Sequence, residues 1–237
     1  MPCWAASWVW RDEPTMTLRV EPRDAVRVVH WEDGDNRVNH ASMQAWHELL
    51  DELEDIDEPF ALVVTGAGKF FSNGLDLDRF AAVPDEAGPT VEALQRLFGR
   101  LLLFPAYTVA AINGHAFAAG AMLSCAFDAR VMREDRGYWC LPEVDLGLPL
   151  SEAMAAVVTA RLPAPAAQDA MLTGRRYGGP AALATGIVSA AVPEAEVLDV
   201  AVALAAEVAT KDRRVIAEHK RLLFGAAAEV CGYAPGR

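Results

Sequence analysis

Residues 110–123 read AAINGHAFAAGAML, an apolar run that ends in Asn113-Gly114 and continues into very small residues. Residues 108–112 (TVAAI) are typical of a strand that is buried on both faces. Residues 118–121 then begin a predicted helix. The small side chains at this strand-to-helix corner either leave room for a ligand against the main chain or only allow close helix packing.

Residues 66–77, GAGKFFSNGLDL, form a second glycine-containing turn of this kind, after a second apolar strand at residues 60–65 (FALVVT). A phosphate loop is excluded because Phe70 follows Gly68-Lys69 where Ser or Thr is required, and the dinucleotide fingerprint fails because Phe71 replaces its third glycine. The segment is either an ordinary turn or a site of outward-pointing amides. Two such corners could each offer one N–H to the same oxygen, which would form an oxyanion hole.

Residues 141–149, LPEVDLGLP, place two acids, Glu143 and Asp145, in an otherwise apolar stretch. They are either exposed loop acids or, in a poorly hydrated pocket, groups with a raised pKa. A carboxylate with a raised pKa suits a general base that works near neutral pH.

Strands and helices alternate along the whole chain, which predicts an α/β fold. The helix at residues 42–54 has Ser42 as its expected N-cap. Residues 83–89 are expected to form a loop. The remaining predicted elements are strands at residues 25–31, 128–132 and 187–192, and helices at residues 91–104, 151–161, 164–172, 194–210 and 212–228.

The chain of 237 residues has a net charge of -12, which argues against a nucleic-acid-binding protein because no general basic surface is expected. A small anionic ligand is not excluded, since a few local cations and main-chain donors are sufficient to bind one. The hydrophobic share of 53% and charged share of 23% fit a globular protein with one substantial core.

Cys3, Cys125, Cys140 and Cys231 form no CxxC pair, and no export signal is apparent, so we expect reduced thiols and a cytoplasmic protein. Residues 1–15 resemble neither a signal peptide nor a membrane anchor and are expected to be a disordered extension or an upstream mis-start. No apolar run reaches the roughly 18 residues of a membrane span. We therefore expect no membrane partner.

Taken in order, the three segments resemble those of the crotonase (enoyl-CoA hydratase/isomerase) superfamily, over roughly residues 17–225. FFSNGLDL is similar to its first oxyanion segment, INGHAFAAGAML to its second, and LPEVDLGLP to its catalytic loop. The FFSNG start and the arginine-rich run before EVD are similar to the plant-type Δ3,Δ2-enoyl-CoA isomerases. The resemblance implies a spiral core of ββα units in residues 16–162. It also implies a helical region in residues 163–237 that helps to form a homotrimer or a dimer of trimers.

The resemblance further implies an acyl-CoA thioester as the substrate, with no separate cofactor and no metal. The backbone N–H groups of Leu75 and Ala119 would bind the thioester oxygen, and Glu143 would transfer the proton. Met122 stands where hydratases carry a second glutamate, and Met122 and Ser151 stand where dienoyl-CoA isomerases carry acids, so a single-glutamate enoyl-CoA isomerase is favoured. Substrate or coenzyme A contacts are implied at Gly66, Lys69, Phe70, Phe71, Gly74, Gly120 and Met122.

By the same resemblance, Lys69, Arg79 and either Lys220 or Arg221 are candidates for phosphate contact; the alternative is that they are ordinary solvated surface charges. Two alternatives stay open. One is another crotonase reaction, such as hydration with Asp145 or Glu152 as a displaced second acid. The other is a catalytically silent acyl-CoA-binding protein.

Other catalytic motifs are weak. No HExxH metal motif, no cysteine pair at ligand spacing and no GxSxG elbow occur. His115 is expected to make a structural hydrogen bond, and Asn73 a hydrogen bond within its turn.

Overall fold

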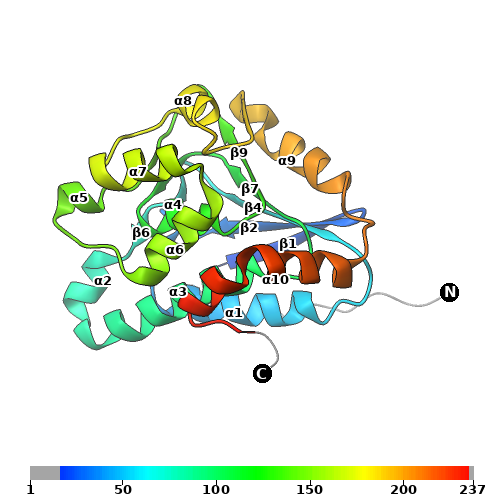
Figure 1. Cartoon of the computed structure of the whole chain (residues 1–237), viewed down its shortest axis with the longest axis horizontal. Helices are drawn as coiled ribbons and strands as arrows, with labels where there is room; N and C mark the ends of the chain where they lie inside the picture. The colour runs from blue at the N-terminus through cyan, green and yellow to red at the C-terminus, as the bar shows by residue number, and fades with distance from the viewer. Residues whose placement is uncertain (1–16, 235–237) are drawn as a thin grey trace.

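The computed structural model describes residues 17–234, which form two main β-sheets surrounded by helices (Figure 1). The large sheet has the strand order β1-β2-β4-β7-β9-β11, and all neighbours are parallel except β1 and β2. Its strands are β1 (Thr17–Arg23), β2 (Val26–Glu32), β4 (Ala61–Gly66), β7 (Thr108–Ile112), β9 (Ala129–Arg133) and β11 (Ala190–Val192). The small parallel sheet has the order β10-β8-β5, with β5 (Phe70–Ser72), β8 (His115–Phe117) and β10 (Trp139–Cys140). A separate pair joins β3 (Arg37–Val38) to β6 (Gly74–Leu75).

Successive strands alternate between the sheets, and this alternation confirms the predicted α/β spiral. In each repeat, one strand enters the large sheet, the next turns out of it, and a helix follows: β4 leads to β5 and β6, β7 to β8, and β9 to β10. The helices are α1 (His40–Glu54), α2 (Leu77–Ala82), α3 (Ala87–Leu102), α4 (Ala119–Cys125), α5 (Glu143–Leu146), α6 (Glu152–Arg161), α7 (Ala164–Thr173), α8 (Gly179–Ala184), α9 (Val197–Ala206) and α10 (Arg213–Val230), with short 3-10 turns at Pro84–Glu86 and Glu194–Glu196. Because each turn of the spiral stacks on the previous one, the corners between the sheets and helices lie side by side.

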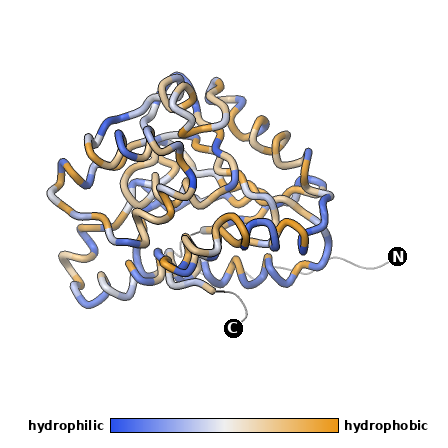
Figure 2. Tube along the Cα trace, viewed as in Figure 1, coloured by the Kyte–Doolittle hydropathy of each residue, from blue (hydrophilic) through white to orange (hydrophobic). Residues whose placement is uncertain are grey.

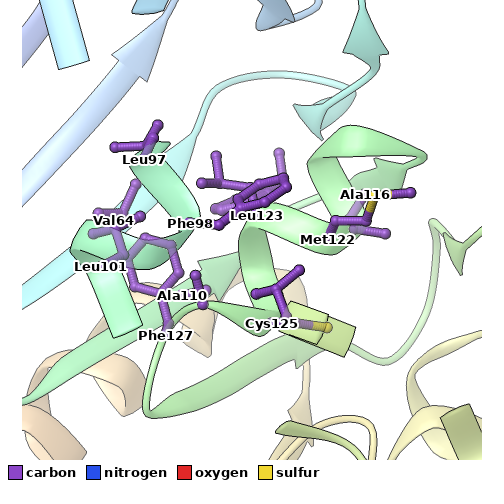
Figure 3. Close-up of a cluster of buried hydrophobic side chains, with 14 of the residues drawn as sticks. Val64, Leu97, Phe98, Leu101, Ala110, Ala116, Met122, Leu123, Cys125 and Phe127 are labelled. Carbon is purple, nitrogen blue, oxygen red and sulfur yellow. The ribbon is translucent and has the colours of Figure 1, made fainter. Parts of the chain in front are cut away.

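The large sheet is buried on both faces, as the apolar runs predict. Alternate residues of β4 enter two different cores: Val64 packs with α1, α3 and α4, whereas Val63 packs beneath α9. Figure 3 shows part of the first core, in which Val64 and Ala110 lie close to the aromatic rings of Phe98 and Phe127. At about 25 cal/mol per Å² of buried apolar surface, this double burial is the main stabilising contribution to the spiral.

The C-terminal helix α10 packs across α3 and α6, so the end of the described chain lies beside the core repeats (Figure 1). Hydrophobic and hydrophilic residues alternate along this helix (Figure 2). Leu222 and Leu223 remain 70% and 71% exposed, whereas Lys220 is buried. No described helix is both long enough and apolar enough to cross a membrane. The cytoplasmic location stays a prediction.

Several predicted boundaries are wrong. The N-cap of α1 is Asn39, and Ser42 is the third helical residue, because the two side chains form a reciprocal capping box. The expected loop at residues 83–89 is instead a 3-10 turn followed by the first turn of α3. Pro89 is tolerated there because the first N–H groups of a helix have no intrahelical acceptor.

Strand β1 and helix α8 were not predicted. The expected extension at residues 1–15 lies outside the described residues, as does Cys3. The other three cysteines are free and buried.

Candidate active site

A cavity of about 410 Å³ lies where the ends of β6 and β8 meet the loop that carries α5. Its wall is largely apolar. Among the described lining residues, Asn73 carries a side-chain amide, and Glu143 and Arg176 carry charged side chains. The apolar lining includes Leu75, Leu77, Phe117, Met122, Leu146, Leu148 and Met154. A cavity of this size and character suits an apolar ligand that is oriented by a few polar groups.

The first corner, around β6, brings a main-chain amide to this cavity. Asp76 N–H donates to Val38 O at 2.9 Å. Because consecutive residues of a strand direct their N–H groups to opposite sides, Leu75 N–H points away from β3. Gly74 has φ +81, and a Cβ atom added there would lie 2.9 Å from Phe117 O and 3.3 Å from Ala119 N. Only glycine therefore allows this corner to approach the second one so closely.

The second corner, between β8 and α4, brings another amide to the same place. Ala119 is the first residue of α4, and its N–H has no acceptor within the helix. The preceding Ala118 has φ 50 and ψ -123, a strained conformation for a residue with a side chain. Gly120 packs on Ser72, where a Cβ atom would lie 2.5 Å from Ser72 O. Close packing between the corners thus places the amides of Leu75 and Ala119 at the edge of one cavity.

Glu143 brings the carboxyl group that lines this cavity. It begins the short helix α5, which ends at Gly147 with φ 67. Its Oε2 atom is buried and has no hydrogen-bond partner within residues 17–234. Burial raises the pKa of this carboxyl above its ordinary value, and a bond to its own backbone N–H only partly opposes the effect. A buried carboxylate without a partner is costly, so this group is held ready to accept a proton.

The neighbouring acids do not reach the cavity. Asp145 lies against Gly174, where an added Cβ atom would meet its Oδ2 at 2.6 Å. Glu152 is exposed in the first turn of α6. At the hydratase position, Met122 lies beside Ala116 in the buried cluster of Figure 3. Glu143 is thus the one carboxyl group among the described residues that line the cavity.

Comparison with known proteins assigns the family. The sequence profile of the enoyl-CoA hydratase/isomerase family matches residues 24–229. The chain belongs to this family. It is 32% identical over 212 residues to peroxisomal enoyl-CoA delta isomerase 2 of Arabidopsis thaliana, covering 84% of this chain and 87% of the relative. It is 36% identical over 209 residues to a putative enoyl-CoA hydratase of Thermus thermophilus, covering 84% and 80%. An apo enoyl-CoA isomerase of Mycobacterium tuberculosis has a similar structure, with a TM-score of 0.82 and 28% identity, covering 91% of this chain and 94% of that chain.

These findings confirm the resemblance to the crotonase superfamily, with enoyl-CoA isomerases among the similar proteins. The chain is therefore an enzyme of the enoyl-CoA hydratase/isomerase kind. Since relatives with both names occur, the choice between the two reactions depends on the site itself.

The remaining predicted contact residues of this family member occupy three environments. Met122 and Leu75 line the cavity, as does Ala119. Phe70, Phe71, Gly74 and Gly120 are buried behind it and shape the corners. Gly66 and Lys69 lie at the turn between β4 and β5, where Gly66 N–H donates to Asn113 Oδ1 at 3.0 Å. The predicted residues therefore include both lining and supporting positions.

The cations predicted to bind phosphate differ in availability. Lys220 is buried, donates to Ala106 O, and pairs with Asp128 at 2.5 Å, so it supports α10 and is not free for a ligand. Arg79 pairs with Glu86, and Arg221 with Glu218. Lys69 has no carboxylate partner among the described residues, and its Nζ lies 5.0 Å from the centre of the Phe70 ring.

The two predicted hydrogen-bonding roles are also resolved. His115 Nδ1 accepts from Tyr138 N–H at 3.2 Å, which confirms a structural hydrogen bond for this residue. Asn73 instead donates to Asp35 Oδ2 at 3.3 Å, a residue distant in the sequence, and it lines the cavity, so the predicted bond within its own turn is wrong.

Sequence reasoning did not identify Phe117, Cys140, Met154 or Arg176 as lining residues. Phe117 had a detectable signal, because it directly precedes the small residues of the second corner. Arg176 had none, since it reaches the cavity through an antiparallel bridge between Trp139 and Tyr177. Such a pairing is set by the tertiary structure and leaves no local pattern.

Proposed function

We propose that the enzyme is a Δ3,Δ2-enoyl-CoA isomerase, which moves the double bond of a 3-enoyl-CoA to the 2-position. The ionised carboxylate of Glu143 removes a proton from C2 of the substrate. The electrons of the broken C–H bond delocalise into a dienolate whose negative charge lies on the thioester oxygen. Glu143, now neutral, returns the proton to C4, and the carboxylate is regenerated without an oxidant or a second substrate.

The observation that carries the proposal is that Glu143 is the one carboxyl group that the described part of the chain brings to the apolar cavity. One carboxylate is sufficient to move a proton between two carbons, because it acts first as the base and then as the acid. Hydration in this family uses two acids to hold and activate water, as the resemblance implies. Met122 at the second position and the displacement of Asp145 and Glu152 from the cavity therefore favour isomerisation.

The main-chain N–H groups of Leu75 and Ala119 would donate to the thioester oxygen as its charge develops. Preorganised donors of this kind stabilise the transition state without reorganising, and removing one typically lowers the rate by about 10²–10³. The apolar wall excludes water and strengthens these bonds. The acyl chain would lie against Leu146, Leu148 and Met154, which line the cavity beyond Glu143.

We further propose that coenzyme A enters as part of the substrate and that the enzyme needs no separate cofactor. We also propose assembly as a homotrimer or a dimer of trimers through the helical region, residues 163–237. The exposed apolar side chains Val215, Leu222, Leu223 and Val230 on α10 support this assembly. Sedimentation equilibrium of the purified chain measures it.

Incubating the purified enzyme separately with a 3-enoyl-CoA and a 2-enoyl-CoA tests the reaction. We expect the 3-enoyl substrate to be isomerised and the 2-enoyl substrate to gain no water. Glu143→Gln keeps the shape of the side chain but removes its proton transfer, so kcat should fall by about 10²–10⁴.

Asp145→Asn is the matched control, because this acid lies on the same short helix but outside the cavity, and it should retain activity. Rapid hydration of the 2-enoyl substrate by the unaltered enzyme would contradict the isomerase proposal and identify the enzyme as a hydratase. Tight binding of both thioesters without turnover would indicate a silent acyl-CoA-binding protein.

A further inference from the structure

Two fully buried polar side chains, Asn36 and Ser72, lie behind the first corner and take no part in the proposed proton transfer. Asn36 directly precedes β3, and Ser72 is the last residue of β5, just before β6. A buried polar group is costly unless it is hydrogen-bonded, and a fully bonded buried network makes its surroundings rigid. The bonds of these two residues converge on the main chain that carries the Leu75 amide.

The Ser72 hydroxyl bridges the two strands of the β3–β6 pair. It donates to Asn36 O at 2.7 Å and accepts from Gly74 N–H at 3.3 Å. Asn36 lies immediately before β3, and Gly74 is the first residue of β6. The hydroxyl therefore sets the position at which β6 turns away from β5. Because the peptide unit is planar and Leu75 follows Gly74, the direction of Leu75 N–H depends on this bridge.

The Asn36 side chain fixes the other end of the bridge. Its Nδ2 group donates to Trp31 O at 2.7 Å and to Phe71 O at 3.0 Å, and its Oδ1 atom accepts from Asp33 N–H at 2.8 Å. Both donors and the acceptor oxygen of the amide are thus bonded. Asn36 has φ 51, a left-handed conformation that asparagine adopts more readily than most residues. It therefore holds its own carbonyl oxygen toward Ser72.

Ser72 also contacts the second corner. A Cβ atom added to Gly120 would lie 2.5 Å from Ser72 O, 2.7 Å from Ser72 Cβ and 2.8 Å from Ser72 Oγ. Gly120 directly follows Ala119, whose N–H is the other amide at the edge of the cavity. The hydroxyl of Ser72 thus bonds beside Leu75, while the rest of the residue packs beside Ala119. One buried residue lies between the two corners and separates them by its own size.

We propose that the Ser72 hydroxyl is a positioning group, which aims Leu75 N–H at the thioester oxygen and fixes its distance from Ala119 N–H. The inference rests on the proposed function, because it requires a thioester oxygen between these amides. Ser72 is not among the residues that line the cavity, so it acts through the main chain of the corners. Since the charge on the oxygen develops only during the reaction, a misdirected donor weakens the transition state more than the bound substrate.

The test compares Ser72→Ala, which removes the bridge, with Ser72→Cys, whose thiol is a weaker donor and acceptor in the same place. The matched control is Ser124→Ala. Ser124 is also fully buried, near the C-terminal end of α4 and away from the cavity lining. Its hydroxyl donates to Ala121 O at 2.7 Å and accepts from Trp139 Nε1–H at 2.9 Å. Each alanine variant therefore loses one donated and one accepted hydrogen bond.

Steady-state kinetics with a 3-enoyl-CoA give the first readout. Complete loss of one oxyanion donor typically lowers the rate by about 10²–10³, so misdirection of Leu75 N–H in Ser72→Ala should lower kcat by about 10-fold or more. The KM should stay nearly unchanged, because the carbonyl of the bound substrate carries little charge. Ser72→Cys should lie between Ser72→Ala and the unaltered enzyme, and Ser124→Ala should keep its kcat.

Infrared difference spectroscopy of a bound saturated acyl-CoA, isotopically labelled at the thioester carbonyl, provides a readout that does not depend on turnover. Two well-aimed donors polarise the carbonyl group, so its stretching frequency should be lower on the unaltered protein and on Ser124→Ala than in solution. On Ser72→Ala the frequency should lie nearer to its value in solution, with Ser72→Cys in between.

Equal carbonyl frequencies on Ser72→Ala and Ser124→Ala overturn the inference, even where kcat differs. A higher KM with unchanged kcat in Ser72→Ala also overturns it, because the residue would then support binding in general and not the direction of one amide. A carbonyl frequency that does not fall on the unaltered protein overturns it as well. Failure of the proposed isomerisation would appear instead as absent turnover, with the fall in frequency and its dependence on Ser72 intact.

Discussion

Replacing Gly74 by alanine tests whether the close approach of the two corners controls both stability and activity. Gly74 has φ +81, and an added Cβ atom would lie 2.9 Å from Phe117 O and 3.0 Å from Ala118 Cβ. The positive φ alone costs a residue with a side chain about 1–2 kcal/mol. Overpacking adds about 1–3 kcal/mol, because the neighbours are a carbonyl group and the start of a helix. We therefore expect Gly74→Ala to lower the free energy of unfolding by about 2–5 kcal/mol.

Gly34→Ala provides the matched control. Gly34 has φ +53, but a Cβ atom there would meet nothing within 4 Å. It should lose only the conformational part, about 1–2 kcal/mol. Urea unfolding of both variants, analysed by linear extrapolation, measures the difference.

Activity provides the second readout of the same pair. Relief of the clash at Gly74 must shift Leu75 N–H relative to Ala119 N–H, so kcat should fall by up to about 10²–10³. Gly34→Ala should leave kcat unchanged. Equal losses of stability in the two variants, or full activity in Gly74→Ala, would refute the view that the two corners pack closely because residue 74 has no side chain.

Two further predictions concern buried charges. Burial raises the pKa of Glu143 in the folded state, so its ionised form destabilises the fold above that pKa, and the penalty disappears as the pH falls through it. Thermal unfolding should accordingly show Glu143→Gln to be more stable than the unaltered enzyme near pH 7, and this gain in stability should shrink as the pH falls. The kcat/KM of the unaltered enzyme should fall over the same acidic range. A gain in stability that is constant with pH would contradict this prediction. Lys220→Met should lower the free energy of unfolding by about 3–5 kcal/mol, because it leaves Asp128 without its buried cationic partner. The control Lys211→Met replaces an exposed lysine and should change the free energy of unfolding by less than about 0.5 kcal/mol.

The repeated strand-to-helix corners could be predicted from local sequence. Their strands are continuous apolar runs, and their turns contain small residues at the positions where the main chain approaches its neighbour. Glu143 stood out because an acid in an apolar stretch has a high desolvation cost. Local chemistry singled out Glu143 and Asp145 together, and the resemblance to the family was needed to choose Glu143 and to assign a role to the corners.

Features that depend on distant parts of the chain could not be predicted in this way. Arg176 reaches the cavity only because Tyr177 pairs with Trp139, and Lys220 is buried only because α10 packs beside Asp128. The start of α1 was misplaced for a different reason. Asn39 and Ser42 are both good capping residues, and only the geometry of the capping box distinguishes them.

The amides of Leu75 and Ala119 belong to the main chain, and every amino acid except proline carries the same N–H group. Mutational drift at either position can therefore reshape the pocket while the N–H groups that we propose as donors to the thioester oxygen are retained. Ordinary side-chain substitutions can therefore change the substrate preference of such an enzyme. The substitutions it forbids are those that bend the backbone: proline at either donor position, and bulk at the glycines behind them.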